Sequence, residues 1–360
     1  MIHKVGVIGA GTMGSGIAQI CLQHGFSVKL YDTYPQALDS GHKKIKEGLA
    51  YVVSRGKFTE LQAKEALSYF KCVDKLDALV DVDLIIEAAS ESLAVKQEIF
   101  QKLGAFLPEN KILATNTSSL PVQKVAEKTR YPARVLGMHF FNPAPVMKLI
   151  EMIRTPQTDE TYFKAAWEFA LALEKTPVEV KDTPGFIVNR VLRPFYVSAL
   201  RLVEEGCAGI SGVDKAAKEV GGCPMGPFEL MDFIGLDVNL AITKVIFEAL
   251  GKPKRLEPSK LQEDLVGRGC LGRKTKKGFY IYQAGQTVKE NSEAPVRRGG
   301  ATVTLWSLES IWSHIEKAII EEAQIAHQEG VATKEGIDTA VRLGARFPQG
   351  PFELQAARGY

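Results

Sequence analysis

A histidine and a glutamate stand twelve residues apart in positions where a sheet would bring them together. His139 lies near the end of an apolar strand candidate, 135–140, and Glu151 lies on the next candidate, 149–153, after the turn at 142–145. Imidazole can accept or release a proton near pH 7. A carboxylate bound to its second nitrogen would select the tautomer and stabilise the imidazolium. The pair predicts proton transfer; the alternative is a structural histidine on an apolar strand.

A glycine-rich loop follows the first strand candidate and opens a helix. Asp32 ends the second strand, 18 residues beyond the loop. In a dinucleotide-binding fold, such a loop brings backbone N–H groups to a pyrophosphate, and the carboxylate binds ribose hydroxyls and repels a 2′-phosphate. We therefore predict NAD rather than NADP; the alternative is a plain turn with a solvated aspartate. The G-x-G-x-x-G pattern consists of Gly9, Ala10, Gly11, Thr12, Met13 and Gly14.

Short β-branched runs alternate with amphipathic runs through the first half of the chain. This rhythm is typical of parallel βαβ units. Beyond Asp182-Thr183-Pro184-Gly185 the strand signals nearly vanish and helical periodicity takes over. The chain is therefore predicted to hold an α/β Rossmann-type dinucleotide-binding domain at 1–184, followed by an all-α domain at 185–282. The strand candidates are 5–8, 28–31, 84–87, 112–115, 135–140, 149–153 and 178–180.

The helical part contains an internal repeat with a constant offset of 124 residues. Val213-Asp214 and PMGPFEL at 224–230 recur as Ile337-Asp338 and PQGPFEL at 348–354. A duplicated helical unit explains the match. The second copy, 305–360, is a truncated repeat, and residues 283–304 have the composition of a linker.

The predicted helix at 305–330 has an apolar side that needs a covering surface. We expect either a pseudo-dimer within one chain or a homodimer. The apolar residues are Leu305, Leu308, Ile311, Ile315, Ile319 and Ile320.

The composition is that of an ordinary globular protein. The 360 residues include 45 Lys and Arg against 42 Asp and Glu, a net charge of +3, and 45% are hydrophobic. This balance excludes intrinsic disorder and gives no basis for nucleic-acid binding. Five cysteines without a CxxC pair favour a reducing compartment, and we predict no metal site. No apolar run approaches the roughly 20 residues that cross a bilayer, and no signal peptide is visible, so we expect a cytoplasmic protein without a membrane partner.

Three longer motifs resemble those of the L-3-hydroxyacyl-CoA dehydrogenases. They are NTSSL at 116–120, HFFNPAPVMKLIE at 139–151 and KDTPGFIVNR at 181–190. The motifs stand in the family's order and spacing, and the likeness extends from Lys4 to about Tyr282. The resemblance implies reversible NAD-dependent oxidation of an L-3-hydroxyacyl-CoA to the 3-oxoacyl-CoA, in fatty acid or related acyl-CoA metabolism. It also implies that His139 and Glu151 are the catalytic dyad.

The resemblance assigns roles to further residues. Ser118 would bind the reacting oxygen, and Asn189, on the first helix of the second domain, would complete the substrate site. Ser118 could instead cap the helix after Leu120. For Asn116 and Asn142 the alternative is capping of the backbone. For Glu91, Lys96 and Lys274 the alternative is an exposed ion pair. By the same resemblance, the cofactor would be contacted by Ser118, Asn116, Asn142, Glu91, Lys96 and Lys274.

Coenzyme A carries three phosphates, so its binding face should be basic. The charged helix after Asp32 and the segment beyond it supply Lys43, Lys44 and Arg55. Arg55 stands where the family has a lysine, and Gly48 stands where a CoA-contacting serine is expected, which leaves the individual contacts open. The alternative is that these charges form a solvated helix face.

Two other functions fit parts of the pattern. One is NADPH-linked reduction of acetoacetyl-CoA, as by a 3-hydroxybutyryl-CoA dehydrogenase; Asp32 argues against that cofactor. The other is a non-enzymatic, crystallin-like structural protein, because an eye-lens crystallin is similar in fold. The intact set His139, Glu151, Ser118 and Asn189 argues against this second alternative.

Overall fold

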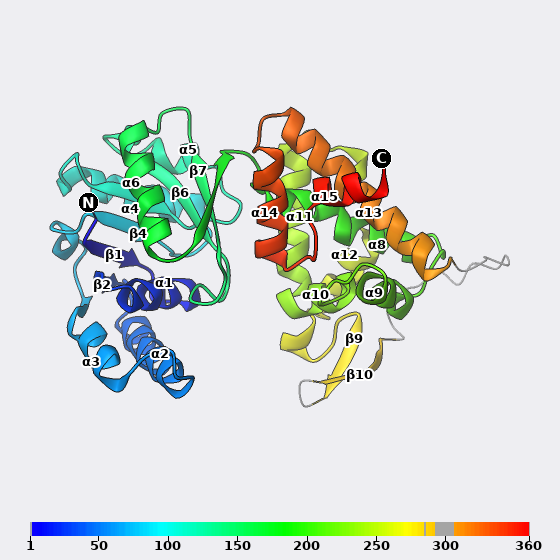
Figure 1. Ribbon diagram of the computed structural model, residues 1–360, viewed down its shortest axis with the longest axis horizontal. Helices are drawn as coiled ribbons and strands as arrows, with labels where there is room; N and C mark the ends of the chain where they lie inside the picture. Colours follow the sequence, from blue (N-terminus) through cyan, green and yellow to red (C-terminus); the bar gives the residue numbers. More distant parts are fainter. Residues whose placement is uncertain (1, 284–285, 292–305, 360) are drawn as a thin grey trace. The chain divides into compact units, whose positions relative to one another are not determined.

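Two compact units make up the chain, residues 1–186 and 187–360 (Figure 1). The computed structural model describes residues 2–283, 286–291 and 306–359. The division lies two residues beyond the predicted domain boundary at 184/185. Among the described residues, no helix has the length and apolarity that crossing a membrane requires.

The first unit is built on one sheet with the strand order β3-β2-β1-β4-β5-β6-β7-β8. Neighbouring strands from β3 to β6 are parallel, which confirms the Rossmann-type prediction. β7 is antiparallel to β6, because the connection at 141–148 is too short for a parallel crossover. β3, a partly exposed edge strand, was not predicted. The strands are β1 (Lys4–Ile8), β2 (Ser27–Tyr31), β3 (Phe70–Val73), β4 (Leu84–Glu87), β5 (Ile112–Thr115), β6 (Val135–Phe140), β7 (Leu149–Arg154) and β8 (Thr176–Lys181).

Helices pack around this sheet. They are α1 (Thr12–Gln23), α2 (Pro35–Ser54), α3 (Glu60–Ser68), α4 (Leu93–Phe106), α5 (Val122–Ala126) and α6 (Glu160–Ala172). The apolar sides of α1, α2 and α6 join one buried core that takes alternate residues of the strands, among them Leu136, Met138 and Phe140 of β6. Because successive strand residues point to opposite faces, His139 is directed away from this core.

The second unit is helical apart from one hairpin. Its helices are α7 (Val188–Val191), α8 (Arg193–Glu204), α9 (Ile210–Glu219), α10 (Pro227–Ile234), α11 (Leu236–Ala249), α12 (Lys260–Gly267), α13 (Leu308–Gln328), α14 (Lys334–Ala345) and α15 (Pro351–Arg358), with short 3-10 helices η3 (Lys254–Leu256) and η4 (Arg273–Thr275). The hairpin pairs β9 (Tyr280–Gln283) with β10 (Gln286–Glu290).

The hairpin corrects part of the predicted linker at 283–304. Residues 286–290 form β10, which was not predicted because this polar strand pairs through its backbone and has little hydrophobic periodicity. Asn291 also belongs to the hairpin, since its backbone N–H donates to Phe279 O at 2.8 Å. The remainder of the predicted linker, 284–285 and 292–304, lies outside the described residues.

The repeat seen in the sequence is a structural repeat. Asp214 Oδ1 accepts a hydrogen bond from the Phe228 backbone at 2.8 Å, and Asp338 Oδ1 accepts one from Phe352 at 2.8 Å. In both copies a glycine lies against the aspartate, and a Cβ added to Gly226 or Gly350 would come within 2.3 Å of it. The second copy therefore repeats the local packing of the first.

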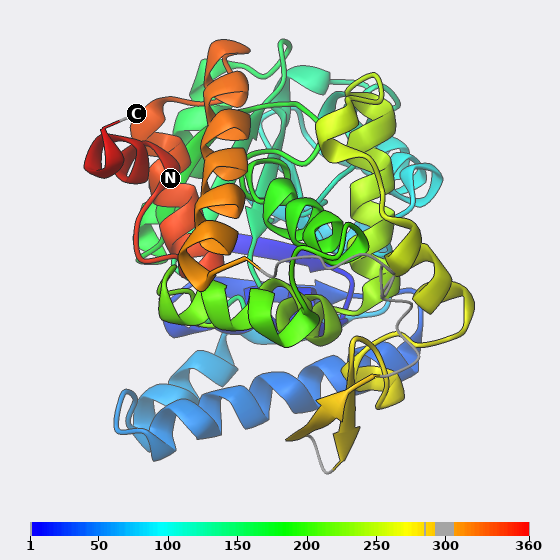
Figure 2. The ribbon, with the colours of Figure 1, turned by 90° about the vertical axis from the view of Figure 1, so that its right-hand side faces the viewer.

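The second copy packs on the first within the same chain. Helix α13, the long orange helix of Figure 2, contacts α8 and α9, and both α13 and α14 contact α7. Trp312 lies so close to Gly221 that a Cβ there would be 2.6 Å from the indole. The rings of Phe195 and Phe347 lie 5.3 Å apart.

The predicted apolar side of α13 is turned into this contact. Ile311, Ile315, Ile319 and Ile320 are buried, whereas Leu308 is partly exposed. Leu305 lies outside the described residues.

Candidate active site

The structure brings His139 and Glu151 into direct contact. They are register partners on the antiparallel strands β6 and β7, so their side chains emerge opposite each other on the same face. His139 Nδ1 lies 2.6 Å from Glu151 Oε2, with both residues buried. The ring of Phe141 lies 4.5 Å from the imidazole, and that of Phe186 lies 5.8 Å from it. A proton held between Nδ1 and the carboxylate leaves Nε2 as the proton acceptor.

Glu91 organises the loop that carries Ser118. Its Oε1 accepts hydrogen bonds from Thr117 Oγ1 at 2.8 Å, from the Ser118 backbone at 2.8 Å and from Ser118 Oγ at 3.0 Å. Burial alone would raise the pKa of Glu91, but the charge of Lys96 and these hydrogen bonds outweigh it and lower the pKa. Glu91 is therefore a charged anchor for the loop beyond β5.

The alternative role for Ser118 as a helix cap is wrong. Helix α5 begins at Val122, and its first N–H groups are bound by Asp182: Val122 N donates to Oδ1 at 3.0 Å and Gln123 N to Oδ2 at 2.7 Å. The sequence could not show this, because Asp182 lies about 60 residues away along the chain.

Lys96 is not an exposed residue. Its side chain is 1% exposed, and Nζ donates to both carboxylate oxygens of Glu87 at 2.8 and 3.0 Å. Glu87 ends β4 and also accepts from Thr115 Oγ1 at 2.7 Å. The exposed ion pair considered for Lys96 is wrong. These partners give the ammonium a structural role beneath the Ser118 loop.

The two asparagines have different surroundings. Asn116 Oδ1 accepts a hydrogen bond from the Phe140 backbone at 2.8 Å and so ties the end of β5 to β6, as the capping alternative expects. Asn142 lies in the loop after β6 and lines a cavity. Lys175, which the sequence did not single out, holds this loop by donating to Ala144 O at 2.7 Å and Met147 O at 2.8 Å.

The glycine loop has the shape that a dinucleotide requires. Gly9 has φ +99°, and a Cβ on Gly14 would lie 1.7 Å from Gly9 O, so neither position tolerates a side chain. A Cβ on Gly11 would meet nothing within 4 Å, which leaves its backbone open to a ligand. Asp32 Oδ2 accepts from the Ala10 backbone at 2.7 Å and Oδ1 from the Tyr34 backbone at 3.0 Å.

These contacts bring the carboxylate of Asp32 to the loop. Thr12, the first residue of α1, lines the cavity described next, and Met13 packs against the core. The residues present therefore fit NAD.

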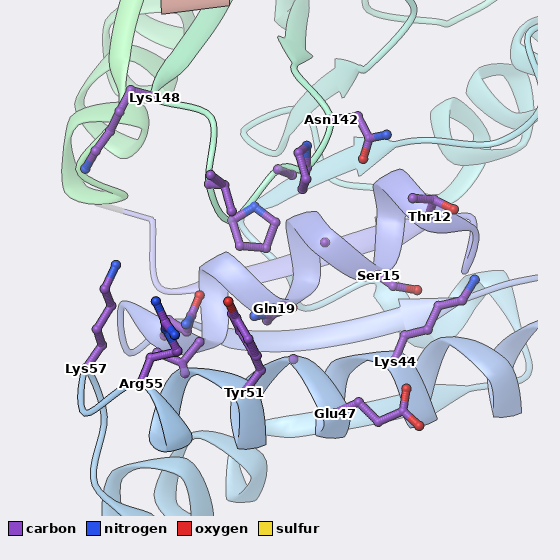
Figure 3. Close-up of a pocket in the computed structure, with 18 residues that line it drawn as sticks. Thr12, Ser15, Gln19, Lys44, Glu47, Tyr51, Arg55, Lys57, Asn142 and Lys148 are labelled. Atoms are coloured by element: carbon purple, nitrogen blue, oxygen red, sulfur yellow. The ribbon is translucent and has the colours of Figure 1, made fainter. Parts of the chain in front are cut away.

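A basic cavity of about 800 Å³ lies between α1, α2 and the loop after β6 (Figure 3). Lys44, Tyr51 and Arg55 rise from one side of α2, and Lys148 comes from the loop end. The lining has four cationic side chains and one acidic side chain, that of Glu47. The cationic residues are Lys44, Arg55, Lys57 and Lys148.

Two sequence expectations change at this cavity. Lys43 does not line it: its side chain is 78% exposed and its Nζ lies 3.9 Å from Glu47 Oε1. Gly48 lies against the end of the Gln19 side chain, and a serine there would require that side chain to move, because a Cβ would lie 2.1 Å from Gln19 Oε1.

Tyr51 and Lys148 were missed. The spacing 44, 48, 51 and 55 could have placed Tyr51 on the face of Lys44. Nothing in the sequence pattern indicated that Lys148 joins this face.

Asn189 and Lys274 belong to the second unit. Asn189 lies on α7, and its backbone oxygen accepts from Arg193 Nε at 3.1 Å. Lys274 Nζ lies 2.6 Å from both carboxylate oxygens of Asp237, and both side chains are partly exposed. This is the ion pair considered as the alternative for Lys274.

Comparisons with known proteins agree with this geometry. Residues 4–183 match the NAD binding domain of 3-hydroxyacyl-CoA dehydrogenases, and residues 185–282 and again 311–359 match their C-terminal domain. The chain is 35% identical to the 3-hydroxyadipyl-CoA dehydrogenase of Escherichia coli, covering 100% of this chain and 91% of that protein. It is 43% identical to a probable 3-hydroxybutyryl-CoA dehydrogenase of Bacillus subtilis, covering 78% and 98%.

A solved structure shows the same arrangement. The 3-hydroxybutyryl-CoA dehydrogenase of Escherichia coli superposes with a TM-score of 0.91 at 34% identity, over 99% of this chain and 92% of that one. The matches to both domains, the glycine loop with Asp32, and the buried histidine–glutamate pair lead to one conclusion. The chain belongs to the 3-hydroxyacyl-CoA dehydrogenase family, whose cofactor is NAD.

Proposed function

We propose that this chain oxidises an L-3-hydroxyacyl-CoA reversibly to the 3-oxoacyl-CoA, with His139 as the base. The observation that carries the proposal is the buried contact of 2.6 Å between His139 Nδ1 and Glu151 Oε2. His139 Nε2 takes the proton of the substrate hydroxyl, and Glu151 stabilises the imidazolium that forms. NAD⁺, when bound, accepts the hydride that leaves the same carbon. In the reductive direction the imidazolium returns its proton to the oxygen.

Two polar side chains complete the proposed site. Ser118 donates a hydrogen bond to the reacting oxygen, and Asn189 binds the substrate near the same oxygen. Glu91 holds the loop through the backbone N–H of Ser118 and through Thr117 Oγ1. The single O–H of Ser118, which donates to Glu91 in this structure, turns to the reacting oxygen when substrate binds.

A single spectrophotometric assay tests the proposal. NADH oxidation by acetoacetyl-CoA, followed at 340 nm, should show turnover, whereas a crystallin-like structural protein should show none. Relatives are named for hydroxybutyryl and hydroxyadipyl substrates. A comparison of a four-carbon acyl chain with a six-carbon chain ending in a carboxylate would therefore assign the substrate. No turnover with either would refute the proposal.

The basic cavity is the proposed site for the coenzyme A phosphates. Lys44, Arg55, Lys57 and Lys148 line it, and phosphate oxygens are strong acceptors for such groups. Arg55→Gln is expected to raise KM for acetoacetyl-CoA about tenfold with little change in kcat, because ground state and transition state lose the same contact.

Lys43→Gln is the matched control, since this lysine lies outside the cavity and should leave KM within about twofold. An N-acetylcysteamine thioester, which has no phosphates, should react equally well with wild type and Arg55→Gln. If Arg55→Gln and Lys43→Gln changed KM for acetoacetyl-CoA equally, the phosphates would bind outside this cavity.

Preference for NADH over NADPH should depend on Asp32. We expect Asp32→Ala to lower kcat/KM for NADH by about tenfold or more, because a charged acceptor for ribose hydroxyls is lost. The ratio of kcat/KM for NADH to kcat/KM for NADPH should fall, because the charge that repels the 2′-phosphate is lost as well. Asp32 also binds the backbone of Ala10 and Tyr34, so Asp32→Asn serves as the control that keeps an acceptor without the charge. Equal or higher kcat/KM with NADPH in wild type would contradict the assignment.

We also propose that the second helical copy replaces a partner subunit. It covers α7, α8 and α9 within the same chain, so this face is not available to a second chain. The five cysteines are free, which supports a cytoplasmic, reducing environment.

A further inference from the structure

Arg190, the residue after Asn189, is held by the second helical copy. Its Nε donates to Glu322 Oε1 at 3.0 Å, and its Nη1 donates to Glu329 Oε2 at 2.6 Å. Both carboxylates come from α13 or its C-terminal end, more than 130 residues away along the chain. The side chains of Arg190 and Glu322 are fully buried, so the pair is shielded from water and from salt.

Glu322 is shared between two arginines of the first copy. Besides Arg190, its Oε2 accepts from Arg255 Nε, on η3, at 2.5 Å. Burial by itself would lower the pKa of Arg190, and the two carboxylates more than offset this effect, so the pKa is raised. The guanidinium therefore remains charged, and the glutamate bridges α7 to η3.

Helix α7 is short, and contacts from both helical copies help to hold it. It spans only Val188–Val191, too short to be stable alone, and no side chain caps its N-terminus. Its contacts include α8 of the first copy and α13 and α14 of the second. On one side Arg193 binds the backbone oxygen of Asn189, and on the other Arg190 is bound by α13. The position of Asn189 therefore depends on both copies.

The contact between Arg190 of the first copy and Glu322 of the second has no counterpart with the two copies exchanged. At the repeat offset of 124 residues, Arg190 corresponds to His314 and Glu322 corresponds to Ser198. Glu329 corresponds to Glu205, so one carboxylate position is common to both copies. A symmetric pair of first copies would therefore lack the glutamate that Arg190 uses here. Of the two carboxylates that bind Arg190, only that of Glu322 is special to the second copy.

We propose that Glu322 is a positioning residue for the substrate site: by holding Arg190, it sets the orientation of α7 and so of Asn189. The inference rests on the proposed role of Asn189 in substrate binding. The second helical copy then contributes to the activity of the enzyme, because a small displacement of a positioning group lowers the rate strongly.

Glu322→Gln in the full chain tests the proposal, with Glu316→Gln as the matched control. Glu316 is also buried on α13 and also bound by an arginine, but that arginine is Arg358 on α15, within the second copy. We expect Glu322→Gln to lower kcat/KM for acetoacetyl-CoA about tenfold while the affinity for NADH, measured by fluorescence, stays unchanged. Glu316→Gln should lower the melting temperature less, because its partner Arg358 is half-exposed, and should leave kcat/KM within twofold.

A double-mutant cycle with Asn189→Ala separates positioning from general damage. If Glu322 acts through Asn189, Glu322→Gln should have almost no further effect on kcat/KM in the Asn189→Ala background. The same tenfold loss in both backgrounds, or an equal loss with Glu316→Gln, would overturn the inference.

The cycle also distinguishes this inference from the proposed function. Full activity of Asn189→Ala would refute the proposed role of Asn189 and the inference that rests on it. If Asn189→Ala loses activity but Glu322→Gln keeps it, only the inference is refuted. If Glu322→Gln does not fold, Glu329→Gln takes its place in the cycle, since Glu329 is half-exposed and also binds Arg190. Its effect should likewise disappear in the Asn189→Ala background, and additive effects would overturn the proposal.

Discussion

Replacing His139 with glutamine is expected to lower kcat by about 10² to 10⁴-fold, the usual contribution of general acid–base catalysis. Glutamine keeps polar atoms near Glu151 but cannot take up the proton of the substrate hydroxyl. The measurement is kcat for acetoacetyl-CoA reduction, with deuterated NADH showing that hydride transfer limits the rate. NADH affinity should remain unchanged, because the glycine loop and Asp32 are intact.

His24→Gln is the control for this substitution. His24 lies at the end of α1, where its Nδ1 lies 2.9 Å from Ile20 O, and its loss should leave kcat within about twofold. Glu151→Gln should also slow catalysis with little change in cofactor affinity, because the imidazolium loses its partner. A folded His139→Gln enzyme with more than about a tenth of the wild-type kcat, under conditions where chemistry limits the rate, would show that the base has been misassigned.

Removing the second helical copy is expected to abolish the soluble monomer. The shortened chain should end after Asn291, because β10 and Asn291 complete the hairpin of the first copy. Loss of the second copy would uncover Phe195 and Gly221, which pack against Phe347 and Trp312. It would also remove Glu322 and Glu329, so Arg190 would lose the two carboxylates that bind it.

Light scattering and thermal unfolding test this expectation. The shortened chain should dimerise or aggregate and should melt below the intact chain, whereas the intact chain at the same concentration should remain monomeric. A soluble monomer of 291 residues with unchanged thermal stability would show that the second copy covers nothing important. A stable dimer of the intact chain would instead show that the repeat does not replace a partner.

Much of the chemistry could be predicted because it depends on residues close together along the chain. The glycine loop and Asp32 lie on consecutive βαβ elements, and a carboxylate that follows β2 necessarily lies beside the loop that follows β1. His139 and Glu151 lie on consecutive strands joined by a short loop, so the pairing was expected. Their position as direct partners, on the face opposite Met138, follows from the antiparallel register, which only the structure shows.

Other residues depended on which helix face met which surface. Periodicity separates Lys43 from Lys44 on α2 but does not show which side faces α1 and Lys148. Packing decided this, and Lys44 lines the cavity while Lys43 lies in solvent. The environment of Lys96 was equally hidden, because an isolated lysine in a sequence gives no sign of a buried partner such as Glu87.

The sequence by itself determined the two-part architecture, the nucleotide loop, the histidine–glutamate pair and the repeat of 124 residues. Tertiary structure decided what holds these parts in place: Asp182 at the start of α5, Glu91 under Ser118, and Glu322 on Arg190. The physical reason is the range of the interactions. Motifs and periodicity record neighbours along the chain, whereas these carboxylates act on groups far away in sequence, and only the folded backbone brings the two within hydrogen-bond distance.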